Sequence, residues 1–310
     1  MVEKGGIEMN VSSTVQKPVR IKKLRSRNSI SFFDIFLWLI MSSTVVAVLY
    51  PVIRIVAGSF SNNELLVRNE VGIIPKGFTL DNYKALFKMD IIWVSYWNTI
   101  KYTLAATFSG VLFTTFGAYP LSKRHFVGRS FWNKMLLFTM LFSGGLIPGY
   151  LVVSGLGWVN TIWSVTIPGA VGAWYIILAR TFFESIPVSM EESAKMDGAN
   201  DIKVLLSIYM PLSKPILATL ALYYAVGKWN DFFGPLIYLT RREKQPLALL
   251  MRSWLIKDDS QSSMEQQMQQ ISQIARNYTA IITTSLPIIC VYPFIQKYFA
   301  KGMMVGAIKG

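Results

Sequence analysis

Cysteine and histidine are almost missing from this sequence, which has one residue of each type among its 310. The single cysteine, Cys290, excludes a disulfide within the chain and a cysteine-rich metal site. The single histidine, His125, excludes a metal site that needs several histidines. The Gly-x-Ser-x-Gly motif of serine hydrolases and the ATP-binding P-loop are also absent. Any ATP that this protein uses must therefore bind to another chain.

Charged residues are scarce as well, and they are unbalanced. Asp, Glu, Lys and Arg make up 15% of the chain, against roughly 25% in a typical soluble domain, while hydrophobic types make up 52%. The 31 Lys and Arg outnumber the 17 Asp and Glu, so the formal net charge is +14. Such an apolar chain is not disordered, and a nucleic-acid binder would carry its basic residues on a polar surface. We therefore expect a membrane protein with its basic residues on one side of the lipid bilayer and no nucleic acid among its partners.

Six apolar segments are each long enough to cross a bilayer. A hydrocarbon core of ~30 Å requires about 20 helical residues at ~1.5 Å each. The first segment is too long for a secretory signal, so we interpret it as an uncleaved span. The expected spans are 32–57, 96–121, 131–154, 161–185, 215–239 and 279–299. The sequence thus predicts an all-α membrane protein with six transmembrane helices.

Three acid-free windows carry most of the positive charge, namely 17–27, 122–134 and 297–310. The positive-inside rule places all three in the cytoplasm, which agrees with six spans and with cytoplasmic N- and C-termini. The expected domains are a basic cytoplasmic tail, a six-helix transmembrane domain with two extracytoplasmic loops, and a cytoplasmic C-terminal tail. Their bounds are 1–30 for the first tail, 31–299 for the transmembrane domain with loops 58–95 and 240–278, and 300–310 for the last tail.

The loop 186–214 departs from this charge pattern, because it is expected in the cytoplasm and yet is not basic. Ser189 and Glu192 form a capping box that predicts the start of a helix, and Gly198 suits the position after its end. Asn200 or Asp201 can cap a second helix. We expect its apolar face, and the prolines that end it, at Ile202, Leu205, Leu206, Tyr209, Pro211 and Pro215. The pattern fits an interfacial amphipathic helix pair or a rigid projection that docks on a partner.

The same loop contains a long spaced motif. Glu192-Ser193-Ala194-Lys195-Met196-Asp197-Gly198-Ala199, followed by Ile208 and Pro211, resembles the EAA loop of binding-protein-dependent ABC importer permeases. The spacing of Gly198, Ile208 and Pro211 matches the family pattern, and Ser193 replaces its first alanine. Trp229-Asn230-Asp231-Phe232 resembles the fifth-span signature of the carbohydrate branch, and 302–310 resembles the tail of the maltose-type second permease. On these motifs the chain is identified as a member of that family, with the type I ABC importer permease fold.

The resemblance implies a transport subunit, not an enzyme, in the bacterial cytoplasmic membrane. It implies a second permease subunit, two ABC ATPase subunits that use ATP and Mg, an extracytoplasmic solute-binding protein near loop 240–278, and a sugar substrate, most simply an oligosaccharide. The chain itself would bind no cofactor and no metal. Three alternatives stay open: an ABC permease for a solute other than a sugar, a self-contained secondary transporter or channel, and a membrane-embedded enzyme.

The resemblance also implies two sets of residues that contact the ATPase. Glu192 would face a basic residue of the ATPase, Gly198 would allow a tight turn, and Met196, Ala199 and Leu205 would fill an apolar groove. The full coupling set is Glu191, Glu192, Ser193, Ala194, Met196, Asp197, Gly198, Ala199, Leu205, Ile208 and Pro211. The tail residues Gly306, Lys309 and Gly310 would reach between the ATPase subunits.

A candidate substrate path lies in the fifth expected span, where ionisable groups are costly and usually face the interior of a helix bundle or a water-filled cavity. Lys228 and Asp231 stand there three residues apart, so they either line the path or pair with each other on one helix face. Nearby aromatic rings can stack on sugars or simply pack in the core. The candidate path residues are Tyr223, Tyr224, Trp229, Asn230 and Asp231.

Overall fold

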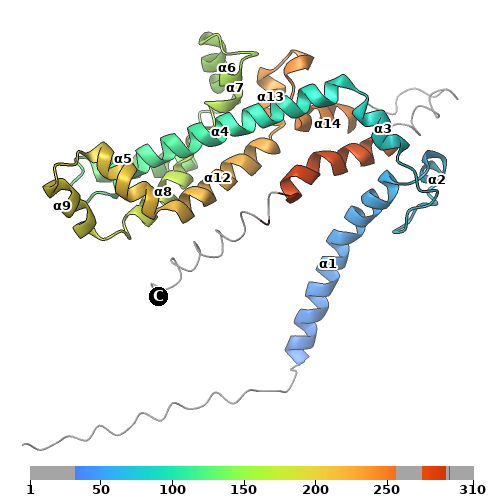
Figure 1. Ribbon diagram of the computed structural model, residues 1–310, viewed down its shortest axis with the longest axis horizontal. Helices are drawn as coiled ribbons and strands as arrows, with labels where there is room; N and C mark the ends of the chain where they lie inside the picture. The colour runs from blue at the N-terminus through green and yellow to red at the C-terminus, as the bar shows by residue number, and fades with distance from the viewer. Residues whose placement is uncertain (1–31, 256–273, 291–292, 294–310) are drawn as a thin grey trace, which may run out of the picture. The chain divides into compact units, whose positions relative to one another are not determined.

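The computed structural model describes residues 32–255, 274–290 and 293, and every regular element in these ranges is a helix (Figure 1). The two tails, the candidates Gly306, Lys309 and Gly310, and most of loop 240–278 beyond residue 255 lie outside the described residues. The helices are α1 (Phe32–Ser59), α2 (Asn63–Val67), α3 (Asp81–Phe87), α4 (Asp90–Ser122), α5 (Arg129–Leu141), α6 (Leu146–Gly155), α7 (Ile162–Thr166), α8 (Ala173–Phe183), α9 (Val188–Met196), α10 (Asp201–Val204), the π-helix η1 (Leu205–Tyr209), α11 (Met210–Leu212), α12 (Lys214–Trp229), α13 (Phe233–Tyr238), the 3₁₀-helix η2 (Arg242–Lys244), α14 (Leu247–Leu255) and a helix over 274–290.

The chain divides into two units, Met1–Leu49 and Tyr50–Gly310, with the boundary inside α1. The 28 residues of α1 are predominantly apolar and would rise about 42 Å as a helix, which is more than a bilayer core requires. Apolar side chains such as Leu37, Trp38 and Leu39 are exposed on it. The helix expected over 32–57 is therefore confirmed, and it ends two residues later than the sequence predicts.

Two described helices, α1 and α4, are long and apolar enough to cross a membrane, and two bent helix pairs would each qualify as one broken span. The pair α5 and α6 bends by 111°, and the helix Asp201–Leu212 bends by 85° against α12. The span expected over 131–154 is broken at its Gly144-Gly145 pair, because the chain leaves the helix after Leu141 and restarts at Leu146 beside Gly145, whose φ is +87°. This φ is accessible to glycine at little cost.

Two further expected spans are interrupted. The span over 161–185 is split between α7 and α8, with Pro168 and Gly169 in the gap, and the span over 215–239 is split between α12 and α13. The helix of the last expected span already includes residue 274, before the expected 279. Proline removes a backbone donor and clashes with the preceding turn, which accounts for the first interruption. The total of six spans stays a prediction.

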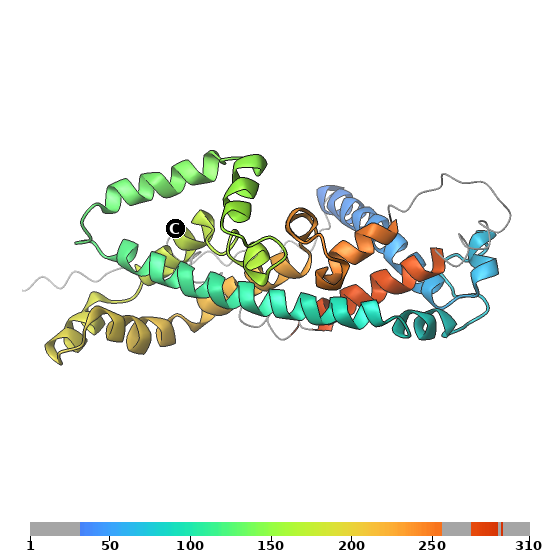
Figure 2. The same cartoon turned by 90° about the horizontal axis from the view of Figure 1, so that it is seen from above.

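The second unit is organised along α4, which has 33 residues. Helix α4 packs most extensively along α12 and α8, and it also contacts α7 and α14. Figures 1 and 2 show α9 near one end of α4 and α3 at the other. Small and hydroxyl-bearing side chains on α4 are buried, among them Ser95, Thr99, Thr114 and Thr115. Such residues let helix backbones approach closely in a membrane protein.

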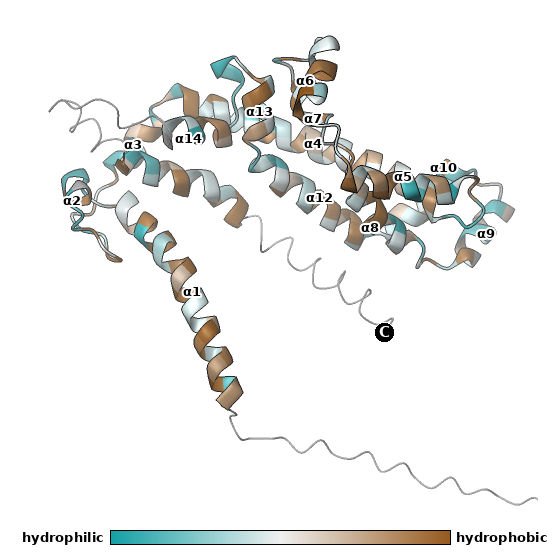
Figure 3. Cartoon of the chain, turned by 180° about the vertical axis from the view of Figure 1, so that it is seen from behind, coloured by the Kyte–Doolittle hydropathy of each residue, from teal (hydrophilic) through white to brown (hydrophobic). Residues whose placement is uncertain are grey.

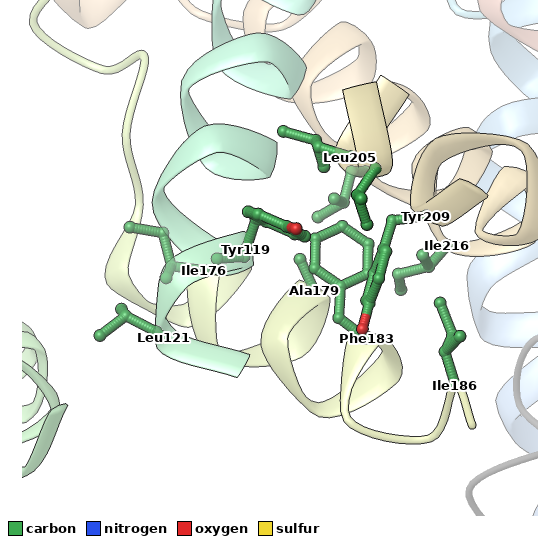
Figure 4. Close-up of a cluster of buried hydrophobic side chains, with 12 residues drawn as sticks. Tyr119, Leu121, Ile176, Ala179, Phe183, Ile186, Leu205, Tyr209 and Ile216 are labelled. Carbon is green, nitrogen blue, oxygen red and sulfur yellow. The ribbon is translucent and has the colours of Figure 1, made fainter. Parts of the chain in front are cut away.

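A cluster of buried apolar side chains fills the end of this unit that lies nearest α9 (Figure 4). Tyr119 from α4 and Phe183 from α8 meet the ring of Tyr209 edge-on, with ring centroids 5.1 and 5.7 Å away. Edge-to-face pairs at this separation are favourable. The buried members are Ala118, Tyr119, Leu121, Ile176, Ala179, Phe183, Ile186, Val204, Leu205, Tyr209, Ile216 and Leu220. Through its members in loop 186–214, this cluster packs that loop against α4 and α8.

Candidate functional site

The loop 186–214 folds as two helices that meet at Gly198. Helix α9 ends at Met196 with Asp197 as its C-cap, and Gly198 follows in the left-handed region with φ +78°. The N–H of Gly198 donates to the carbonyl of Lys195 at 3.0 Å, and the N–H of Ala199 donates to that of Ala194 at 2.9 Å. This pair of bonds is a Schellman motif, which satisfies the last carbonyls of a helix. The glycine end expected from the sequence is confirmed.

The start of α9 differs from the prediction. The helix begins at Val188 after Pro187, and no side chain caps its first turn. Ser189 lies inside the helix, so the expected capping box is wrong, because the preceding proline already sets the backbone turn. The cap of the second helix is confirmed at Asn200, whose side chain accepts a hydrogen bond from the N–H of Lys203 at 2.8 Å.

The apolar face of the second helix is also shifted. Ile202 and Leu206 are exposed by 59% and 49%, whereas Val204, Leu205 and Tyr209 are buried. The buried face is thus centred on Val204 and Leu205, and the helix continues through these positions into the π-helix η1. The helix ends at Leu212, one residue after Pro211, and Pro215 lies in the first turn of α12.

The coupling candidates separate into an exposed and a buried group. Leu205 is only 2% exposed and packs in the chain's own core, so it cannot fill a groove on a partner, and this expectation is corrected. Ala194, Ala199 and Ile208 are half-buried against the same core. Met196 is exposed by 88%. The exposed group is Glu192, Ser193, Met196, Asp197, Gly198 and Pro211. Figure 3 shows the helix α9 in mostly hydrophilic colours, in contrast to α8.

Glu191 is buried, unlike its neighbour Glu192, and forms the centre of a charge network. Its Oε2 pairs with Nζ of Lys123 and accepts a hydrogen bond from the hydroxyl of Tyr209 at 3.0 Å. Its Oε1 pairs with Lys195 at 2.9 Å, and Lys195 also reaches Asp201 at 3.2 Å. Burial alone would raise the pKa of Glu191, but the hydrogen bonds from Lys123, Lys195 and Tyr209 hold this pKa below its ordinary value.

Lys123 is the residue that the sequence analysis missed. Its ammonium lies 4.1 Å from the ring centroid of Tyr119 and 3.8 Å from that of Tyr209, so two aromatic faces and one carboxylate surround it. In the sequence, Lys123 is one of the basic residues of the acid-free window 122–134. There it indicates only on which side of the membrane the loop is expected to lie. No sequence pattern connects it with Glu191, which lies 68 positions away.

A cavity of about 360 Å³ lies where α4, α8 and α12 meet. Four of the five candidate path residues line it, namely Tyr223, Tyr224, Asn230 and Asp231. Trp229 does not line it, since its indole N–H donates to the carbonyl of Thr284 at 3.1 Å. The remaining lining residues are Ala106, Thr166, Gly169, Tyr175, Gly227, Lys228, Phe232 and Phe233.

The ion pair that the sequence left open is present at this cavity. Nζ of Lys228 lies 2.7 Å from Oδ2 of Asp231, while Oδ1 of Asp231 accepts the N–H of Gly234 at 3.0 Å. The pairing interpretation of Lys228 and Asp231 is confirmed; both side chains also line the cavity, and their role in a substrate path stays a prediction. The arrangement neutralises both charges while leaving a cation and an anion within reach of a bound solute.

Three tyrosines form an aromatic wall of the cavity. Tyr175 stacks on Tyr223 with ring centroids 5.9 Å apart, and it meets Tyr224 at 4.7 Å. The hydroxyls of Tyr224 and Thr114 are hydrogen-bonded at 2.7 Å, which anchors the wall to α4. Among the described residues, no group of three His, Cys, Asp or Glu side chains could hold a metal ion.

Comparison with known proteins gives a consistent result. Residues 130–305 match the family model of the inner membrane component of binding-protein-dependent transport systems. Protein LplC of Bacillus subtilis (strain 168) is 41% identical over 280 residues, which cover 90% of this chain and 95% of that protein. The polygalacturonan/rhamnogalacturonan transport system permease protein YtcP of the same strain is 36% identical over 284 residues, which cover 90% of this chain and 98% of that protein.

A solved structure is similar over nearly the same length. It is the crystal structure of a bacterial ABC transporter involved in the import of the acidic polysaccharide alginate. One of its chains matches with a TM-score of 0.80 and 33% sequence identity, and the match covers 88% of this chain and 98% of that chain. The similarity therefore extends beyond the range of the family model to α4 and the residues before it.

Proposed function

The chain belongs to the family of inner membrane components of binding-protein-dependent transport systems, and from this membership we propose that it forms half of the translocation pore of an ATP-driven oligosaccharide importer. It is a permease subunit of the ABC importer type. In the proposal the chain crosses the bacterial cytoplasmic membrane six times, with both termini in the cytoplasm. The acid-free windows 17–27, 122–134 and 297–310 support this orientation.

The proposed complex supplies what this chain lacks. A second permease subunit completes the pore, two ABC ATPase subunits bind ATP and Mg, and an extracytoplasmic solute-binding protein delivers the sugar. The absence of a P-loop from the sequence supports a separate ATPase. The chain itself would hold no cofactor, and its role would be transport without chemical catalysis.

The observation that carries the proposal is the form of loop 186–214, named here the coupling loop. Its first helix presents Glu192 and Met196 to solvent, while Glu191 and Leu205 tie its base to the core. An exposed surface on a rigid base suits docking, because little conformational freedom is lost when a partner binds. Glu192 would pair with a basic residue of the ATPase, and the exposed Met196 would enter an apolar groove.

The cavity supports a carbohydrate as the substrate. Tyr175 and Tyr223 offer stacked rings, and such surfaces bind the apolar faces of sugars. Asn230, Lys228 and Asp231 supply donors and acceptors for hydroxyl groups. Because the names of two similar proteins refer to the acidic polymers polygalacturonan and alginate, and Lys228 lines the cavity, we extend the proposal to acidic oligosaccharides.

The test is sugar uptake by the reconstituted complex of this chain with its second permease, ATPase and binding protein in proteoliposomes. Glu192→Lys should abolish ATP-dependent uptake and binding of the ATPase, because the reversed charge faces a basic partner. Glu70→Lys is the matched control, since Glu70 is also exposed and lies in the extracytoplasmic loop 58–95. Wild-type uptake by Glu192→Lys would overturn the coupling role. Uptake by this chain without ATPase and nucleotide would favour a secondary transporter or channel.

A further inference from the structure

One half-buried cation joins the end of α4 to the first helix of the coupling loop. Lys123 directly follows the last residue of α4, and its side chain is exposed by 18%, while that of Glu191 is exposed by 10%. The ammonium of Lys123 pairs with Glu191 and lies over the rings of Tyr119 and Tyr209. Because a carboxylate and two aromatic rings contact this ammonium group, its position is restricted and it stays paired with Glu191.

The network around Glu191 joins the end of α4 to the helices of the coupling loop. Lys123 directly follows α4, and Lys195 lies in α9. Asp201 is the first residue of α10, and Tyr209 is the last residue of the π-helix η1. Both oxygens of Glu191 are engaged, one by Lys195 and the other by Lys123 and Tyr209. Loss of the Lys123 contact would leave the loop attached to α4 by apolar packing alone.

Helix α4 connects this network to the cavity. Ala106 lines the cavity, and α4 ends 16 residues farther along at Ser122, a rise of about 24 Å at ~1.5 Å per residue, where Lys123 directly follows. Between them, Thr114 holds the hydroxyl of Tyr224, which also lines the cavity. A displacement of the coupling loop that is transmitted to Lys123 therefore moves a wall of the cavity, because a helix behaves as a rigid element.

We propose that Lys123 is a positioning residue for coupling, which fixes α9 to α4 so that movement of the coupling loop becomes movement of the cavity wall. The inference rests on the proposed coupling function of residues 186–214. Lys123 contacts no substrate, and as an inward-facing residue it does not form the docking surface. Its effect is on the transmission of movement, so its loss should separate ATP hydrolysis from transport.

The experiment measures ATP hydrolysed per sugar taken up by the full reconstituted complex. Lys123→Met keeps much of the length of the side chain and removes the charge. It should raise the ratio about tenfold, within the usual range of coupling between sites, while the ATPase still copurifies because Glu192 and Met196 are unchanged. Lys123→Arg should stay near wild type, since arginine pairs with carboxylates and stacks on rings. Arg124→Met removes the next cation of the same loop, which is exposed, and should leave the ratio unchanged.

A second variant keeps the test decisive if Lys123→Met fails to assemble. Glu191→Gln has nearly the same shape and should also raise the ratio, and the double variant should be no worse than the more severe single one, because both remove the same contact. A wild-type ratio in Lys123→Met, or in Glu191→Gln where the first variant does not assemble, overturns the inference. Loss of ATPase binding in Glu192→Lys together with a wild-type ratio in Lys123→Met would overturn the role of Lys123 alone. Unchanged uptake by Glu192→Lys would overturn the coupling function itself.

Discussion

The ring of Tyr224 lies directly against the backbone of Gly110, so that a Cβ atom at position 110 would stand 2.7 Å from Cδ1 of the tyrosine. This contact is where α4 and α12 approach each other beside the cavity. The missing side chain of Gly110 makes room for the ring, and the ring then reaches Thr114 one turn along α4. Close approach of two helices through a glycine is a common device in membrane bundles.

Gly110→Ala should weaken the packing of Tyr224 against α4 beside the cavity. The added methyl would push Tyr224 away from α4 and break its hydrogen bond to Thr114, at a cost of about 1–3 kcal/mol. The measurement is the thermal unfolding midpoint of the purified protein in detergent. Gly117→Ala is the matched control on the same helix, because the nearest atom to its Cβ would be 3.4 Å away on Ile176. Equal midpoints for the two variants would contradict the role of the contact.

Gly198→Ala should destabilise the turn of the coupling loop without a steric clash. A Cβ at Gly198 would meet no atom within 4 Å, so the cost comes only from its φ of +78° and is about 1–2 kcal/mol. Gly198→Asn should be milder, because asparagine tolerates this conformation. Hydrogen exchange of the amides of Gly198 and Ala199 would measure the effect. If the amides exchange at the same rate in the alanine and asparagine variants, the positive φ of position 198 does not determine the stability of this turn.

Glu191 should make stability depend on pH in the acidic range. Its pKa in the folded protein is below the ordinary 4.5 despite burial, because Lys123, Lys195 and Tyr209 favour the charged form. The stabilisation is thus fully present above pH 4.5 and is lost as the pH falls through the folded-state value. The difference in unfolding midpoint between wild type and Glu191→Gln should be constant above pH 4.5 and shrink below it. A difference that does not depend on pH would contradict this assignment.

Asp231→Asn should change substrate preference more than stability. The amide oxygen can still accept the N–H of Gly234, but Lys228 loses its counter-charge in the cavity. We expect uptake to shift toward acidic over neutral oligosaccharides, which competition between the two sugars would measure. Asp81→Asn is the matched control, since Asp81 also pairs with a lysine three residues away, outside the cavity and exposed. If Asp231→Asn leaves the preference between acidic and neutral oligosaccharides unchanged, the ion pair of Asp231 with Lys228 has only a structural role.

Features that depend on neighbouring residues could be read directly from the sequence. The glycine end of α9, the Asn200 cap and the ion pair of Lys228 with Asp231 are each formed within five positions. The helix α1 was equally accessible, because a long apolar run has few alternatives to a helix in lipid. In contrast, the capping box at Ser189 failed, since Pro187 supplied a competing start signal at the same place.

Helix continuity was harder to predict than helix existence. Gly144-Gly145 marks where the segment 131–154 can break, but the sequence does not give the 111° bend between α5 and α6. Ile202 and Leu206 are exposed because the helix turns Val204, Leu205 and Tyr209 toward the core, and a fixed period read from the sequence does not tell which face turns inward. Such breaks are decided by packing between helices.

The sequence by itself determined that the chain is a helical membrane protein of the binding-protein-dependent transport family, that it has no P-loop, and that loop 186–214 carries the spaced motif on which the proposed coupling role rests. These follow from local composition, motif spacing and the absence of particular residue types. Only the tertiary structure decided that Glu191 and Leu205 face inward, that Trp229 lies off the cavity, and that Lys123 meets Glu191. The physical reason is that burial and pairing across 68 positions depend on how α4 and the coupling loop pack together, and no local pattern of residues encodes that contact.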